Sequence, residues 1–288
     1  MITAFQQQTK ISRTSNDLFQ QLSKLLKGEE LDFDSLSMEL KNQPLSFLKN
    51  TIQGQALLKP FGYAGDFLMI DKIYLRHINP DPQYGQWDKL FHDQDAPQAV
   101  RNRKAYFKNK VSSRLRNRKK VSLLNIASGP ARDLLELYNG LSDATQLQTT
   151  CVDMDENAIQ YAKILNHDYL DHIDFVNKNI LRFQAKQKYD LIWSAGLFDY
   201  FDDKVFLLLL NRIKKWLKPG GEIIIGNFNA DHNPSRKYME EVGEWFLNHR
   251  TAGELVALAT KAGFDLESIS VGSEPLYVNL FLHIKLKP

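Results

Sequence analysis

The sequence predicts an α/β fold, with a doubly wound, mostly parallel seven-stranded sheet and an N-terminal helical cap. From residue 121 onward, apolar strand-like runs alternate with helix-like segments, which is typical of a parallel sheet. A turn of small residues follows the first of these runs, and an aspartate ends the second. Helical patterns dominate residues 1–118. We therefore predict a helical cap and substrate region over residues 1–118 and a sheet core over residues 119–288.

The helical cap begins with leucines at three- and four-residue steps, which predict a helix over about residues 18–28. A second helix is expected from Asp34, and Pro44 ends it or opens the next one. Further along, Gly62 and Gly65 predict a turn. Asp66 then stands where it can cap the apolar helix that follows.

The core continues with strands and helices in alternation. Strands are expected over residues 121–126, 147–153, 173–176, 189–194, 222–226, 266–271 and 276–285. Helices are expected over residues 132–138, 156–165, 205–217, 236–247 and 253–262. The last two strands are separated by Gly272-Ser-Glu-Pro and predict a hairpin that finishes the sheet.

The small-residue turn after the first strand lets backbone approach a ligand, such as a cofactor carboxylate or a ribose, because no large side chain intervenes. By itself it fits an ordinary strand–turn–helix unit equally well. Asp153 ends the second strand about 20 residues beyond, where an acidic residue can bind both hydroxyls of a ribose. The turn positions read Ala127, Gly129 and Ala131, so the full G-x-G-x-x-G of nicotinamide enzymes is absent.

These residues resemble the motifs of class I S-adenosylmethionine-dependent methyltransferases. The resemblance is carried by Asn125-Ile-Ala-Ser-Gly-Pro-Ala131, Asp153, Asn179-Ile180 and Lys218-Pro-Gly-Gly-Glu222. It implies an enzyme with S-adenosyl-L-methionine as cofactor and a Rossmann-like methyltransferase sheet. The implied cofactor-binding residues are Asn125, Ala127, Ser128, Gly129, Asp153, Met154, Asn179, Ile180, Ser194 and Gly196.

Four further phrases resemble the bacterial methyltransferases of 3-hydroxypalmitic acid methyl ester biosynthesis, which make a quorum-sensing signal. The phrases are Lys59-Pro-Phe-Gly-Tyr-Ala-Gly-Asp66, Val100-Arg-Asn-Arg103, Gly196-Leu-Phe-Asp-Tyr200 and Trp245-Phe-Leu-Asn-His-Arg250. The resemblance implies an O-methyltransferase that esterifies a lipophilic carboxylic acid, with Tyr63, Asp199, Tyr200 and Arg250 as catalytic-site residues. Core packing for the tyrosines, a helix cap for Asp199 and an ion pair for Arg250 remain open alternatives.

The region after the fourth strand, residues 194–202, bears on the reaction. A carboxylate acceptor is ionised at neutral pH and needs no base, whereas an alcohol does. The region has neither histidine nor Asn-Pro-Pro-Tyr, which counts against an amino-methyltransferase of nucleic acid bases. A methyltransferase for a phenol, an amine or a natural-product intermediate is the alternative.

Composition narrows the class of protein. Hydrophobic residues make up 43%, enough for a substantial core, and the single cysteine excludes an intrachain disulfide. The histidines show no metal-ligand spacing, so no metal is expected. No apolar run approaches a membrane span, and we expect a soluble, cytoplasmic protein.

One segment, residues 101–120, holds ten Lys and Arg residues and no Asp or Glu, within a chain of net charge +3. Ala105, Val111 and Leu115 stand at helical spacings within it, which favours a solvated basic helix packed before the first strand. The alternative is a protein that binds a polyanion or a partner through this run, although no nucleic acid partner is expected. The sequence does not determine the oligomeric state.

Overall fold

The computed structural model describes residues 37–38, 40–116 and 120–287, so the helix predicted over residues 18–28 lies outside the described residues. The chain forms two compact units. The first unit comprises the described residues up to Gln98 together with Pro234–Phe246, and the second comprises Ala99–Asn233 and the residues from Leu247 onward. Residues 99–116 thus group with the sheet, while the functional division into cap and core at residue 118 stays a prediction.

The first unit is helical. Its helices are α3 (Leu45–Asn50), α4 (Ile52–Leu58), α5 (Phe67–Leu75) and α6 (Pro82–His92), with a π-helical turn at Tyr238–Val242. The predicted cap of α5 is confirmed, since the Asp66 side chain accepts a hydrogen bond from the Met69 N–H at 2.9 Å. The helix predicted over residues 236–247 is shorter, because the chain is irregular from residue 243 to 249.

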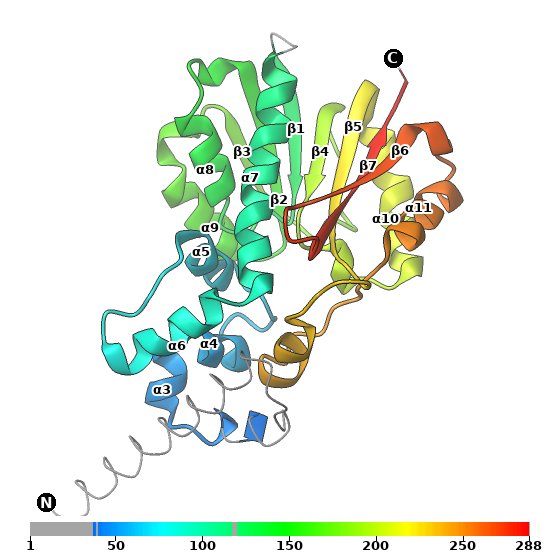
Figure 1. Ribbon diagram of the computed structural model, residues 1–288. Helices are drawn as coiled ribbons and strands as arrows, with labels where there is room; N and C mark the ends of the chain where they lie inside the picture. Colours follow the sequence, from blue (N-terminus) through cyan, green and yellow to red (C-terminus); the bar gives the residue numbers. More distant parts are fainter. Residues whose placement is uncertain (1–36, 39, 117–119, 288) are drawn as a thin grey trace, which may run out of the picture. The chain divides into compact units, whose positions relative to one another are not determined.

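The second unit contains one seven-stranded sheet, in the order β3-β2-β1-β4-β5-β7-β6 (Figure 1). Its strands are β1 (Val121–Ile126), β2 (Leu147–Asp153), β3 (Ile173–Asn177), β4 (Tyr189–Ser194), β5 (Leu217–Phe228), β6 (Ile269–Ser273) and β7 (Asn279–Lys285). The first five strands are parallel, and β7 pairs antiparallel with both β5 and β6. The predicted fold class and the closing hairpin are confirmed.

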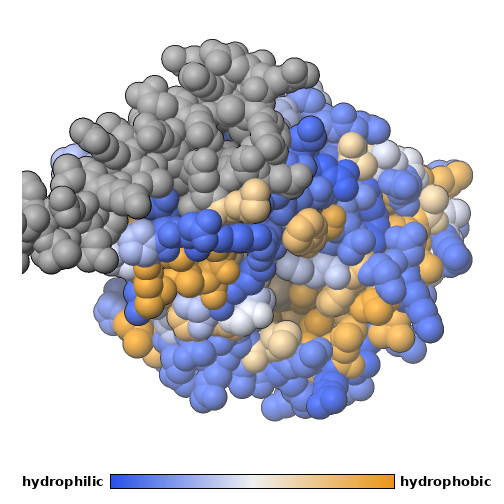
Figure 2. All heavy atoms as spheres, turned by 90° about the horizontal axis from the view of Figure 1, so that it is seen from below, coloured by the Kyte–Doolittle hydropathy of each residue, from blue (hydrophilic) through white to orange (hydrophobic). Residues whose placement is uncertain are grey.

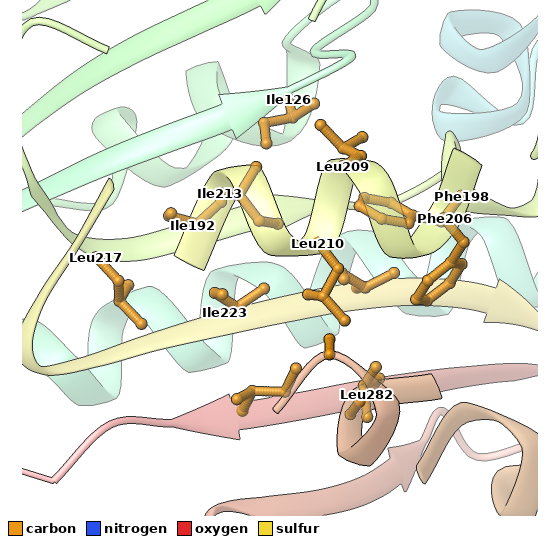
Figure 3. Close-up of a cluster of buried hydrophobic side chains, with 14 of the residues drawn as sticks. Ile126, Ile192, Phe198, Phe206, Leu209, Leu210, Ile213, Leu217, Ile223 and Leu282 are labelled. Atoms are coloured by element: carbon orange, nitrogen blue, oxygen red, sulfur yellow. The ribbon is translucent and has the colours of Figure 1, made fainter. Parts of the chain in front are cut away.

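Helices cover both faces of the sheet (Figure 1). The helices are α7 (Asp95–Arg116), α8 (Arg132–Asn139), α9 (Glu156–Leu165), α10 (Asp203–Ile213) and α11 (Ala252–Lys261). Side chains of α7, α8 and α9 share one core cluster with one face of the sheet, and those of α10 and α11 share another with the opposite face. Figure 3 shows the second cluster, in which Phe206, Leu209 and Ile213 of α10 lie against β1, β4 and β5.

Helix α7 carries the basic run, and the residues on its buried side are spaced more regularly than the sequence analysis predicted. Arg103, Phe107, Val111 and Leu115 are all buried and recur at every fourth position, which places them on one side of the helix. Ala105, which the sequence favoured for that side, is exposed.

Strand β5 begins earlier than predicted, at Leu217 rather than Glu222. Pro219 and the two glycines after it, part of the Lys218-Pro-Gly-Gly-Glu222 phrase, are typical of a turn before the strand. They instead form an irregularity within β5, where the register with β4 shifts between Tyr189 and Leu191.

Apolar side chains also reach the surface, and on the face in Figure 2 they lie among hydrophilic ones. Within the described parts of the chain, no helix combines the length and apolar character needed to cross a membrane.

Candidate active site

The loop between β1 and α8 adopts a tight, glycine-like path. Ala127, Gly129 and Ala131 all have positive φ angles, of 52°, 53° and 51°. Such left-handed backbone costs a non-glycine residue about 1 kcal/mol. The Ala127 N–H donates to the Val152 carbonyl at 2.8 Å, which ties the loop to the end of β2. A Cβ added to Gly129 would meet no atom within 4 Å, so open space lies beside this backbone.

Asp153, at the end of β2, faces the same loop. Its Oδ2 accepts a hydrogen bond from the Gly129 N–H at 2.8 Å, and its Oδ1 accepts one from the Asp155 N–H at 3.0 Å. Burial raises the pKa of this carboxyl above its ordinary value, and the hydrogen bonds from the two N–H groups offset part of that rise. A carboxylate accepts about four hydrogen bonds, so two positions remain for ligand hydroxyls.

Two neighbouring strand ends present further predicted residues. Met154 follows β2 and is 71% exposed, which leaves its thioether side chain available to an apolar ring. Asn179, beyond β3, is exposed, and its Oδ1 accepts from the Leu181 N–H at 2.9 Å. Ile180 is buried in the core cluster. Of this pair, Asn179 is therefore the residue with polar atoms at the surface.

The ends of β1 and β4 hold buried polar atoms that the protein does not satisfy. Asn125 Nδ2 and Ser194 Oγ have no hydrogen-bond partner among the described residues. Buried polar atoms usually have a hydrogen-bond partner, and an atom without one lowers the stability of the folded state by about 1–3 kcal/mol. Both therefore suit a polar ligand at this edge of the sheet.

Gly196, two residues beyond β4, packs against a buried arginine. A Cβ at Gly196 would lie only 3.0 Å from a terminal nitrogen of Arg103, so glycine makes room for that guanidinium. Arg103 comes from α7 and also donates to the Ala195 carbonyl at 3.4 Å. The loop after β4 thus has a cation held against its backbone.

Asp199 and Tyr200 form the next turn, the 3₁₀ segment Phe198–Tyr200. Asp199 is 2% exposed, whereas Tyr200 is 38% exposed. Burial raises the pKa of Asp199 to about 6, and the charges of Arg103 and Arg250 oppose the rise. The alternative in which Asp199 caps the following helix is wrong, because the Asp202 side chain accepts from the Val205 N–H at the start of α10.

Arg250 forms the ion pair that the sequence left open as the alternative to a contact with a substrate carboxylate. Its guanidinium donates to the Phe198 and Phe201 carbonyls at 3.1 and 2.6 Å and to Asn227 Oδ1 at 3.0 Å. It also makes two hydrogen bonds to Asp203 Oδ1, at 3.1 and 2.9 Å. A guanidinium has five N–H donors, and these five bonds use them all. Arg250 therefore holds the 198–203 loop in place.

The model of a methyltransferase domain family matches residues 117–267, about half of the chain. The chain belongs to this methyltransferase family. The protein is accordingly an enzyme, and S-adenosyl-L-methionine is its methyl donor. A curated relative, malonyl-[acyl-carrier protein] O-methyltransferase 2 of Ilyobacter polytropus, is 33% identical over 61 residues. That match covers 21% of this chain and 23% of the relative, so it spans about a quarter of the relative's length.

Solved structures share the fold of this methyltransferase. A possible exported protein from Bordetella parapertussis matches with a TM-score of 0.72 and 19% identity, over 96% of this chain and 97% of that one. The S-adenosylmethionine-dependent methyltransferase SibL, in its apo form, matches with a TM-score of 0.54 and 13% identity, over 86% of this chain and 70% of that one. Identities this low establish the fold alone.

The residues at the strand ends of this methyltransferase fit the methyl donor. The donor carries ribose hydroxyls, for which Asp153 keeps two accepting positions, and a charged amino-acid end, for which the Gly129 loop leaves space. Asn125 Nδ2 and Ser194 Oγ add polar partners. The assignment of single contacts stays a prediction, as does that of Tyr63, which lies in the first unit between α4 and α5.

Arg103 is a buried cation beside the loop after β4 that the sequence analysis did not single out. It is 6% exposed, and its charge acts on both Asp133, at the start of α8, and Asp199. Burial raises the pKa of Asp133 to about 6 as well. The sequence contains a clue, because Arg103 stands in the same four-residue register as Phe107, Val111 and Leu115. A basic residue on the apolar side of a helix needs a buried partner.

Much of the remaining charge of α7 is paired within the second unit. Lys104 and Lys108 both bind Glu136 of α8, at 2.5 and 3.1 Å, and Arg114 binds Glu222 of β5 at 3.0 Å. These contacts favour a packed basic helix over a polyanion-binding surface. Among the described residues, no cluster of His, Cys, Asp or Glu is arranged to hold a metal ion.

Proposed function

We propose that this methyltransferase esterifies the carboxylate of a lipophilic acid, with a 3-hydroxy fatty acid as the preferred acceptor. The observation that carries the proposal is the buried guanidinium of Arg103 against Gly196, in the loop that follows β4. Loops after the strands of an open α/β sheet are where its ligands bind. An arginine suits a carboxylate, because its guanidinium is always charged and its N–H groups make strong hydrogen bonds to an anionic oxygen.

Arg103 takes the role that the sequence gave to Arg250. All five N–H donors of Arg250 bond to groups of the protein, so we do not assign Arg250 to the substrate. We assign the substrate carboxylate to Arg103, whose guanidinium lies beside the loop after β4. Its charge also offsets that of Asp199, which would otherwise repel an acidic acceptor.

The four phrases that resemble the hydroxypalmitate ester enzymes support the choice of a fatty acid. The name of the curated relative describes an O-methyltransferase for malonyl-[acyl-carrier protein], which supports an O-linked acceptor. Methylation removes the charge of the acid and leaves a neutral ester, a suitable chemistry for a diffusible signal.

In the proposed reaction, the chain's main contribution is alignment. When bound, S-adenosyl-L-methionine supplies the methyl group on its sulfonium. Asp153 and the Gly129 loop would hold the donor, and Arg103 would hold one carboxylate oxygen. The second oxygen would then bond to the methyl carbon as the carbon–sulfur bond breaks, with the neutral thioether as the leaving group. Alignment of this kind is worth about 7–11 kcal/mol in well-oriented systems. No proton must be removed, because the acceptor is already ionised at neutral pH.

The proposal is tested by incubating the protein with donor labelled on its methyl group and a panel of acceptors. The panel contains free fatty acids, 3-hydroxy fatty acids, phenols, amines and RNA. We expect label in the methyl esters of the acids. Label that enters a phenol, an amine or RNA and stays out of every acid rejects the proposal.

Variants at α7 then test Arg103. Arg103→Met is expected to raise the acceptor KM by about 10- to 100-fold, the value of a hydrogen bond to a charged group, with little change in affinity for S-adenosylhomocysteine. Lys108→Met, which removes a cation from the same helix, serves as the matched control, since Lys108 pairs with Glu136. Equal KM values for the two variants would remove Arg103 from the acceptor site.

A further inference from the structure

Asp199 has an oxygen that none of the described residues hydrogen-bonds. The residue is 2% exposed, and its Oδ1 has no hydrogen-bond partner among the described residues. Buried carboxylate oxygens are hydrogen-bonded as a rule, since an unpaired one loses the hydration it has in water. The oxygen is thus in a position to accept a bond from a group that arrives with a ligand.

Hydrogen bonds fix the backbone around Asp199, so the Cα from which its side chain projects is held in place. Its own carbonyl accepts hydrogen bonds from the Asn248 N–H at 2.6 Å and from Asn248 Nδ2 at 3.3 Å. On either side of it, the Phe198 and Phe201 carbonyls are held by Arg250. A binding group works best when the surrounding structure locks it in place, and Asp199 meets that condition.

The charges around Asp199 suit an acidic acceptor that also carries a hydrogen-bond donor. The charges of Arg103 and Arg250 act on Asp199 and stabilise its ionised form. With Arg103 on the acceptor's carboxylate, as proposed above, the neighbouring Asp199 can take a donor group from the same molecule. A hydroxyl near the carboxylate is such a group.

We propose that Asp199 Oδ1 accepts a hydrogen bond from the hydroxyl of a hydroxy acid and makes the enzyme select hydroxylated acids over plain ones. This inference rests on the proposed function. The methyl donor also carries a hydrogen-bond donor, its ammonium group. The position of Asp199 after β4, beside Gly196 and Arg103 rather than in the Gly129 loop, assigns it to the acceptor.

The test is a competition between a 3-hydroxy fatty acid and the unsubstituted acid of equal chain length, with labelled donor. Sites that bind a substrate hydroxyl discriminate strongly against analogues without it, so we expect the wild type to favour the hydroxy acid by at least about tenfold in kcat/KM. Asp199→Ala should bring this ratio close to one. Asp199→Asn should keep part of it, because the amide oxygen still accepts.

The ratio does not depend on the amount of folded protein, since both acids compete for the same enzyme. Asp171→Asn, at an exposed aspartate outside the site, is the matched control and should keep the wild-type ratio. Binding of S-adenosylhomocysteine, measured by calorimetry, should be unchanged in the Asp199 variants.

Four results would overturn the inference. A wild-type ratio near one, or a ratio that survives in Asp199→Ala, shows that Asp199 does not read the hydroxyl while esterification itself stands. A tenfold loss of S-adenosylhomocysteine affinity in Asp199→Asn with an unchanged ratio assigns the oxygen to the donor's ammonium. Methylation of neither acid by the wild type rejects the proposed function, and this inference with it.

Discussion

The clearest prediction concerns Arg250, whose replacement by lysine should destabilise the protein without a direct effect on the acceptor. Arg250 is 4% exposed and bridges α11's preceding loop to the 198–203 loop and to β5. If all its donors are used by the protein, Arg250→Lys removes structural hydrogen bonds and no substrate contact.

The magnitude follows from the acceptors left behind. Three of them, the Phe198 and Phe201 carbonyls and Asn227 Oδ1, depend on the planar fork, and a lysine ammonium is a single point that can serve about one. The Phe198 carbonyl keeps its hydrogen bond from the Phe201 N–H, so it loses only the bond from a charged donor, about 1.5–3 kcal/mol. One further acceptor is left unpaired at about 1–3 kcal/mol, which gives a loss of about 2.5–6 kcal/mol. Asp203 adds little, because its side chain is 70% exposed and water replaces the ion pair.

For a chain of this size, such a loss lowers Tm by about 5–24 °C. The assay is thermal unfolding followed by circular dichroism, combined with acceptor kinetics well below Tm. Arg236→Lys is the control, since that arginine makes an i,i+4 ion pair with Glu240 at the surface. Its Tm should stay within about 2 °C of the wild type.

The reasoning is refuted if Arg250→Lys keeps the wild-type Tm and raises the acceptor KM tenfold or more. That outcome would mean that the guanidinium gives its donors to the substrate, as the resemblance implied, and that the contacts with residues 198–203 are of little consequence.

Three further predictions concern the donor site, the packing of α7 and the response to pH. Asp153→Ala should weaken S-adenosylhomocysteine binding by about 100-fold or more in calorimetry, since two hydrogen bonds to a charged group are lost, and unchanged affinity would contradict the ribose assignment. Gly272→Ala should lower stability by about 1–3 kcal/mol, because its Cβ would lie 2.5 Å from the Tyr106 hydroxyl, which makes a 2.7 Å hydrogen bond with His283. The control Gly253→Ala, where the nearest atom is 3.9 Å away, should be neutral or stabilising. The unfolding free energy should fall as pH rises from about 4 to about 6, because folding raises the pKa of Asp133 and Asp199 from 3.8 to about 6 and the folded state holds their protons longer. Below pH 3.8 the unfolding free energy should instead fall as pH falls. Folding lowers the pKa of Asp190 from 3.8 to about 2, so the stabilisation that its ionised form provides is lost between these pH values. Denaturation at stepped pH checks both slopes, and the first should flatten in Asp133→Asn and Asp199→Asn.

The buried strands were the most predictable part of the fold. The predicted bounds 121–126, 147–153 and 189–194 are those of β1, β2 and β4. Each is a short, largely buried run bounded by turn residues, and β1 and β4 are mostly apolar, which is the local pattern of a parallel strand covered on both sides. Helix α9 was also predictable from its local sequence, because Asp155 stands at its start and caps it by accepting from the Asn157 N–H.

Errors arose where long-range pairing outweighed local preference. Pro219 and the glycines after it favour a turn, yet β5 runs through them, because pairing with β4 accommodates the irregularity. The predicted strand over 266–271 begins at Ile269, after a 3₁₀ turn at Leu266–Ser268. Ala127 and Ala131 keep a glycine-like backbone although local preference disfavours it, since hydrogen bonds to the end of β2 hold the loop.

The sequence by itself determined the order of strands and helices, the tight loop at Gly129 and the aspartate after β2, because periodicity, turn residues and helix caps act between near neighbours. It also predicted the loop after β4 as the place for an acceptor. Only the tertiary structure decided which groups Arg250 and Arg103 contact around that loop. Arg250 is used up by carbonyls about fifty residues away, and Arg103 is brought to Gly196 from a helix that precedes the sheet. The partners of a buried cation are groups far away in the sequence, which folding alone brings within hydrogen-bonding distance.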